Sequence, residues 1–507
     1  MFHRYVLSNG IEVISEPMEN RKTAALGVFV RVGSQNETKE NNGISHLLEH
    51  MLFKGTQNHS AKEIADITAR MGDDVNAFTS KECTALYGMT VTERMEELAM
   101  LLGDMLTASL FEAKELAKEK RIVMDEIDMY QDSAEDLVHE LLQKRVWRDD
   151  ALGYLISGTK SVVRTFRSEQ LRRFHQEHYF AENMLISAAG GYEEARMLEW
   201  LERAFAGVRR RGAAPGAPEP QQGRGTQKPE TPRERKSGPL SPEETAAWIR
   251  QEKAGQLSLS TYHKEYERAG GAEHVEKYPE ERAGCTVGRR KECADAAGMC
   301  AEHAGGCGKE RSSAAAPRYW RSFASADREI EQFHINLAFP ALCVGDERRF
   351  AYSVLNSAFG GSNNSLLFQK IREEAGMAYS VYSYSSAYVR AGLFHIDITV
   401  QPQLAVPVLG RAAELAENFA RSGLTEEELS LYKQQVETEL IMSAESPKTR
   451  MDSNAKFALA GAPLYTLEQK LAKIEEITCG DIRQLAAEIL QPSVCSVCVA
   501  GDRSCAD

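Results

Sequence analysis

The sequence predicts an α+β protein built from two homologous α/β-sandwich repeats, each an antiparallel sheet flanked by helices, joined by a long, poorly ordered insertion. Three observations lead to this prediction. Strand-like and helical patterns follow one another in both halves of the 507-residue chain. The two halves repeat the order of these elements and end similarly, in SAAGGY and CVAGDR. Between them the composition changes abruptly, which divides the chain into 1–210, 211–317 and 318–507.

The first unit begins with a hairpin and then alternates strands with helices. Asn9-Gly10 is typical of a tight turn, here between 5–7 and 11–14. Ser60 and Glu63 form a capping box that starts a helix, and Gly72 is placed to end it. Further strands are predicted at 24–32, 86–91 and 184–191, and further helices at 93–109 and 112–130.

The second unit shows the same alternation, which indicates an internal duplication. Its predicted strands are 333–339, 392–400 and 494–500, and its predicted helices are 348–359 and 366–374.

The insertion, residues 211–317, contains six Leu, Ile, Val and Phe residues but nine Pro and fourteen Gly. Such a segment buries too little apolar area for a sizeable core, so we expect a poorly ordered linker. A second metal site is an alternative here, but the cysteines lack the short spacing of common zinc modules. The residues concerned are Cys285, Cys293, Cys300, Cys307 and His303. We expect the other six cysteines to be free thiols.

The formal net charge of the chain is −13. The insertion carries 17 basic and 16 acidic residues, so the remainder has a balance of about −14. A negative body argues against nucleic-acid binding and fits a receptor for basic peptides. No stretch approaches about 18 apolar residues, which argues against a membrane span. Because folded structure is predicted almost from Met1, we expect no targeting segment and a cytoplasmic location.

The most informative motif is His46-Leu47-Leu48-Glu49-His50. On a helix, positions i and i+4 lie on one face, so His46 and His50 can share a metal ion. Glu49 lies beside them and can reach a water bound to that ion, as the general base of a hydrolytic zinc site does. Residues 41–43 offer turn and N-cap chemistry before this helix, and Gly55 is placed to end it.

The helix at 112–130 contains two further candidates, Glu119 and Glu126. They are seven positions apart and so return to the same face after two turns. Ile122, Val123 and Ile127 indicate that part of this helix is buried. Buried carboxylates are unfavourable unless they are paired or bound to metal, so either residue can complete a metal site.

The H-x-x-E-H motif resembles that of the inverzincin peptidases, the family of pitrilysin, insulin-degrading enzyme and the mitochondrial processing peptidase. The resemblance continues through residues 51–56 and implies one zinc ion per chain. Glu126, 76 positions after His50, matches the third ligand of the family. Glu119 matches a supporting carboxylate, which orients a His ligand and raises its basicity.

Two more segments resemble the family. Asn76, Ala77, Phe78 and Thr79 match the strand that binds an extended substrate as an added β-strand. In the second unit, Arg372 and Tyr379 match an Arg and a Tyr that hold substrate and stabilise the oxyanion. Without the family, these two would be a surface charge and a strand aromatic. Leu366 departs from the pattern, which usually has Arg there.

Together these features predict a zinc endopeptidase that cleaves peptides or unfolded segments, presequence-like basic ones included. With two repeats, the chain resembles the processing-peptidase branch, in which two chains enclose a chamber. A homodimer is the simpler expectation, with Arg372 and Tyr379 facing the zinc ion of the same chain or of its partner. The alternative is a non-catalytic family subunit that binds peptide as a scaffold. Such subunits typically lose a ligand or the base, and this sequence retains all of them.

Overall fold

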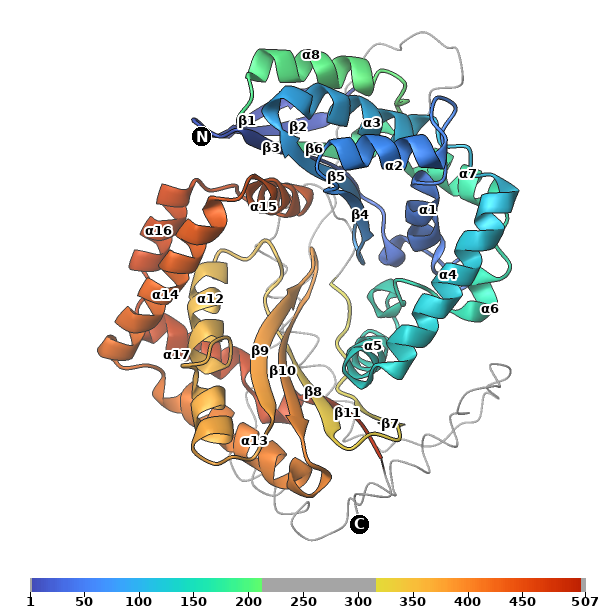
Figure 1. Cartoon of the computed structure of the whole chain (residues 1–507). Helices are drawn as coiled ribbons and strands as arrows, with labels where there is room; N and C mark the ends of the chain where they lie inside the picture. Colours follow the sequence, from blue (N-terminus) through green and yellow to red (C-terminus); the bar gives the residue numbers. More distant parts are fainter. Residues whose placement is uncertain (1, 212–315, 503–507) are drawn as a thin grey trace, which may run out of the picture.

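The computed structural model of the chain describes residues 2–211 and 316–502 (Figure 1). Residues before the insertion form a six-stranded sheet, and residues after it form a five-stranded sheet. Helices flank both sheets, so the predicted α+β class is confirmed. The predicted poorly ordered linker and the alternative cysteine site fall on residues outside the described part.

The first sheet has the strand order β1-β2-β6-β3-β5-β4, and all neighbours are antiparallel except β2 and β6. One face is covered by helices of the same half. The strands are β1 (His3–Val6), β2 (Glu12–Pro17), β3 (Thr23–Val30), β4 (Val75–Thr79), β5 (Thr84–Val91) and β6 (Met184–Gly190). The helices are α1 (Ile44–Leu52), α2 (Ala61–Arg70), α3 (Met95–Thr107), α4 (Ala113–Asp132), α5 (Ala134–Val146), α6 (Lys160–Val163), α7 (Ser168–His178) and α8 (Glu194–Ala204).

The second sheet has the order β7-β11-β8-β10-β9, and its parallel pair is β7 and β11. This is the order of the first sheet without β1, as an internal duplication predicts. The strands are β7 (Phe323–Asp327), β8 (Phe333–Pro340), β9 (Ser380–Ala387), β10 (Gly392–Val400) and β11 (Ser496–Gly501). The helices are α12 (Arg349–Phe359), α13 (Ala405–Ser422), α14 (Glu426–Ala444), α15 (Pro447–Leu459), α16 (Leu467–Glu475) and α17 (Cys479–Ile489).

The two halves exchange a helix. In Figure 1, α15 of the second half lies against the first sheet, and α5 of the first half lies against the second sheet. Met451 of α15 is fully buried, and its carbonyl accepts a hydrogen bond from Ser187 on β6, 2.8 Å away. Arg450 and Asn454 of the same helix donate to the Glu16 carboxylate on β2. Each sheet is therefore covered on its second face by the other half, an arrangement that the sequence did not predict.

Polar contacts hold α5 on the second sheet. His139 of α5 lies between Tyr384 on β9 and Asp397 on β10, with its Nδ1 2.6 Å from the Tyr384 hydroxyl and its Nε2 3.2 Å from Asp397 Oδ1. One turn earlier, Glu135 accepts a hydrogen bond from Tyr382. Ser133 ends α4 and caps α5, so these contacts also fix the course of α4.

Several local predictions are confirmed, and others need correction. The Ser60 capping box is present, and Cys83, Cys479, Cys495 and Cys498 are free thiols. The predicted helix at 366–374 is confirmed, with a π-helix over Phe368–Glu373, but the strands β7 and β9 were not predicted. Within residues 2–211 and 316–502, no helix is both long and apolar enough to cross a membrane.

Candidate metal centre and active site

The helix α1 presents His46, Glu49 and His50 on one side because its other side is buried. Leu47, Leu48, Met51 and Leu52 are at most 1% exposed and pack into the core of the first half. Because this apolar face has helical spacing, the H-x-x-E-H residues must face away from it.

The start of α1 is held by a carboxylate that the sequence did not suggest. Gly43 is the N-cap residue at φ +96°, and a Cβ there would lie 2.6 Å from the Ser157 carbonyl oxygen. Buried Glu37 accepts hydrogen bonds from the backbone N–H groups of Gly43 and Ser45 and from the Asn42 side chain. The predicted N-cap within residues 41–43 is thus confirmed at Gly43, and Glu37 adds a carboxylate at the positive end of the helix.

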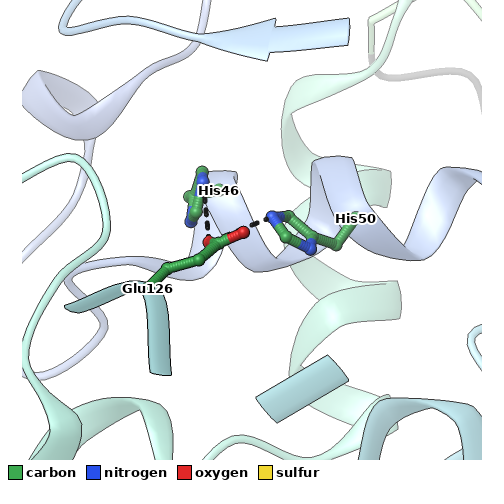
Figure 2. A group of neighbouring side chains, drawn as sticks. All are labelled: His46, His50 and Glu126. Carbon is green, nitrogen blue, oxygen red and sulfur yellow. Dashed lines mark ion pairs between the residues drawn. The ribbon is translucent and has the colours of Figure 1, made fainter. Parts of the chain in front are cut away.

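The three predicted metal ligands come together (Figure 2). His46 Nε2 lies 3.9 Å and His50 Nε2 3.6 Å from the same atom, Oε2 of Glu126 on α4. One ligand atom of each residue lies within 4.8 Å of the other two. Within residues 2–211 and 316–502, no other group of three His, Cys, Asp or Glu residues meets this condition.

This donor set fits zinc. The two nitrogen-to-oxygen distances are too long for hydrogen bonds. They are close to the separation of about 3.4 Å between two ligand atoms in a tetrahedral site with metal–ligand bonds of about 2.05 Å. Burial, with a smaller contribution from the neighbouring His50, lowers the pKa of His46 to about 4. The imidazole is therefore neutral near pH 7 and has a lone pair to offer a metal ion. Two imidazoles and one carboxylate also leave a fourth position open, as hydrolytic zinc sites do.

Glu119 supports one of these ligands. Its Oε2 lies 3.2 Å from His50 Nδ1, the ring nitrogen that faces away from Glu126, and its side chain is almost fully buried. Its other oxygen contacts Lys54, 2.9 Å away. Val123 and Ile127 beside it are buried as predicted, but Ile122 is 44% exposed, so the predicted burial of Ile122 was wrong. Ile122 lies just outside the face of α4 that packs on the core.

Glu49 is held by the strand β4. The Thr79 hydroxyl donates to Glu49 Oε2 over 2.6 Å. Burial raises the pKa of Glu49, the Thr79 hydrogen bond and His50 oppose this rise, and the Glu126 carboxylate adds to it. A carboxylate with a raised pKa takes up a proton more readily than one in water does, which suits a general base.

The strand β4 forms an edge of the first sheet and pairs only with β5. The residues on either side of it, Asp74 and Ser80, bond to the backbone opposite them. Because such bonds alternate along an antiparallel strand, the backbone groups of Ala77 and Thr79 point to the open edge. The Ala77 N–H accordingly bonds to the neighbouring Asn76 side chain. Phe78 lies on the opposite face from Thr79, against Phe29 and Tyr87.

Arg372 and Tyr379 lie on the second half, away from these contacts. Arg372 stacks over the Phe368 ring at 4.8 Å, and Tyr379 is 71% exposed just before β9. Among the described residues, no hydrogen bond or ion pair joins either of them to His46, His50 or Glu126.

Comparisons with known proteins show the family of this chain. The sequence model of the insulinase peptidase family M16 matches residues 12–160, and that of the M16 inactive domain matches 165–265 and 312–436. A Bacillus subtilis protein, the uncharacterized zinc protease YmxG, is 30% identical over 96% of both chains. The chain belongs to peptidase family M16. An uncharacterized zinc protease of Streptomyces coelicolor is 28% identical to this M16 chain, over 96% of it and 87% of the relative.

Two solved structures share the fold. An M16 inactive domain from Pseudomonas fluorescens superposes with a TM-score of 0.73 at 16% identity, covering 99% of this chain and 98% of that one. A protease from Helicobacter pylori gives a TM-score of 0.73 at 15% identity, with 99% of both chains covered. At these identities the likeness concerns the fold alone.

The roles of three residues at this site were not predicted from the sequence. Glu37 and Lys54 were given no role, and Thr79 was expected to contact substrate rather than Glu49. Only Lys54 had a usable signal, since it follows His50 by four positions and so extends the same helical face.

We expect the purified chain to bind zinc at this site with a stoichiometry of one, measured by metal analysis and chelator competition. His46→Ala and Glu126→Ala should each weaken zinc binding at least about 100-fold, since ligands matter more than the outer partners whose loss costs about 10- to 100-fold. His3→Ala removes a histidine on β1 and should leave the affinity unchanged. Wild-type affinity in either ligand variant would exclude this site.

Proposed function

We propose that the chain is a zinc-dependent endopeptidase that cleaves peptides and unfolded segments. The observation that carries this proposal is the juxtaposition of Glu49 with the group formed by His46, His50 and Glu126. Three ligands leave a position open for chemistry, and a carboxylate stands beside it. A structural zinc site would have four protein ligands and would need no base.

Different side chains of the protein have different roles in the proposed hydrolysis. When bound, zinc supplies Lewis-acid activation of water and of the scissile carbonyl. Thr79 fixes Oε2 of Glu49, so the proton of the attacking water passes to Oε1. Glu49 then returns this proton to the leaving amine, which completes the cleavage of the amide bond. Glu119 keeps the His50 ring in position throughout.

The open edge of β4 is the proposed substrate site. An extended peptide that pairs with Ala77 and Thr79 gains main-chain hydrogen bonds that do not depend on its sequence. Because the Thr79 side chain contacts Glu49, a strand paired at Thr79 runs past the catalytic carboxylate. This supports peptides and unfolded segments as substrates, since a folded protein has few free strand edges to offer.

We further propose that two identical chains enclose the site and that Arg372 and Tyr379 act on the zinc site of the partner. The exposure of Tyr379, and the lack of bonds from either residue to His46, His50 or Glu126 in their own chain's described part, support action across the dimer. A cation and a phenol are suitable donors to the charge that develops on the carbonyl oxygen.

Glu49→Gln should strongly slow cleavage of a mixed peptide library while leaving zinc affinity intact, because the amide keeps the shape of the side chain but cannot take the proton. We expect kcat/KM to fall about 10²- to 10⁴-fold. Glu169→Gln changes an exposed carboxylate on α7 and should have no effect. Equal turnover by wild type and Glu49→Gln would refute the proposed catalytic role. Peptide binding without cleavage by the zinc-loaded wild type would favour the scaffold alternative.

Ala77→Pro tests the substrate strand. Proline removes the N–H that points to the open edge, but the ladder to β5 does not use that group, so the fold should persist. We expect KM for peptides to rise about tenfold, the value of one hydrogen bond of about 1.4 kcal/mol, with zinc affinity unchanged. Ala77→Val keeps the N–H and should behave like wild type. An unchanged KM in the folded Ala77→Pro variant would place the substrate elsewhere.

Mixing two inactive variants tests action across the dimer. Glu49→Gln chains and Tyr379→Phe chains each lack activity as homodimers, but a mixed dimer contains one intact site. Random exchange makes about half of all dimers mixed, so the mixture should recover about a quarter of wild-type activity. No recovery, with subunit exchange verified by differently tagged chains, would show that Tyr379 does not serve a partner's site.

A further inference from the structure

Lys54 lies on a short segment whose backbone is fixed from both sides. Its N–H bonds to the Met51 carbonyl at the end of α1, and Gly55 follows at φ +108°. Thr56 then donates to Asp104 on α3 over 2.5 Å. His59 and Asn58 contact the same carboxylate. These contacts fix the backbone of the segment. The fixed backbone directs the Lys54 side chain toward Glu119 on α4.

The ammonium group of Lys54 meets Glu119, at 2.9 Å from Oε1. Glu119 is 3% exposed, so solvent does not compensate its charge. Its partners in the described part of the chain are Lys54 on one oxygen and His50 on the other. A carboxylate bound at both oxygens cannot rotate, and a buried charge that loses one partner is strongly destabilised.

We propose that Lys54 is a positioning residue for the metal centre: it fixes Glu119 so that Oε2 stays aligned with His50 Nδ1 and the His50 ring presents Nε2 to the metal. The contacts form one series, from Asp104 through the loop to Lys54, Glu119 and His50. This inference rests on the metal binding of the proposed function, but not on peptide cleavage.

The proposal makes a prediction opposite to that of simple electrostatics. Removing a cation near the site should by itself strengthen the binding of Zn²⁺, because like charges repel. If Lys54 acts by positioning, its removal should weaken binding instead, because the Glu119 carboxylate turns away from His50. Loss of outer partners of metal ligands typically weakens affinity about 10- to 100-fold, and we expect about tenfold for Lys54, which lies one contact further out.

The experiment measures zinc affinity of the full chain by competition with a chromogenic chelator. Lys54→Met should bind about tenfold more weakly, and Lys54→Arg, which restores a cation of similar reach, should recover most of the loss. Lys62→Met is the control, because Lys62 is a surface lysine on α2 that pairs with exposed Asp66. The visible spectrum of the Co²⁺-loaded protein reports on ligand geometry rather than on stability. It should change in Lys54→Met but not in the control.

A double-variant cycle shows whether Lys54 acts through Glu119. In a Glu119→Ala background Lys54 has no carboxylate to hold, so Lys54→Met should change zinc affinity less than about twofold. Unchanged or tighter zinc binding by Lys54→Met, or an undiminished effect in the Glu119→Ala background, would overturn the proposal. Inability of the zinc-loaded wild type to cleave peptides would instead count against the proposed function and leave this test intact.

Discussion

The architecture depends on covering two sheets whose central strands are buried on both faces. Along β3 and β6 almost every residue is buried, and the same holds for β8 and β10. A sheet of this kind loses much of its favourable burial if one face meets water. Each half has helices for one face only, and the second face is covered by α15 or α5 of the other half. Each half therefore completes the burial of the other.

The exchange of helices affects the candidate metal centre because α5 continues from α4. The helix α5 is fixed on the second sheet by His139 and Glu135, and α4 leads directly into it. Since α4 carries both Glu119 and Glu126, two of the groups around His50 are positioned by contacts made on the other half of the molecule. The second half thus contributes to the geometry of the site even without a side chain in it. A single repeat would retain the H-x-x-E-H helix but lack this constraint on Glu126.

Local structure was predictable from the sequence because neighbours along the chain decide it. Helical spacing placed His46, Glu49 and His50 on one face, and the Ser60 capping box marked the start of α2. The same spacing put Glu119 and Glu126 together, but only the family resemblance indicated which of them faces the metal. Contacts across 30 or more positions had no local signal: Thr79 reaches Glu49, and Met451 packs on β6. The exposure of Ile122 was missed for the same reason, since its surroundings belong to other elements.

The open edge of β4 can pair with a substrate peptide and also with an unrelated extended chain. An unpaired strand edge invites pairing with any extended segment, including another copy of the protein. Here the edge is five residues long, and the Asn76 side chain already bonds to the Ala77 N–H, so an incoming strand must displace that contact. A short edge gives few hydrogen bonds, and most of the favourable energy must then come from groups at the reacting centre. Under the proposed function, such an edge would hold a peptide for cleavage without holding its products tightly, which is the balance that turnover requires.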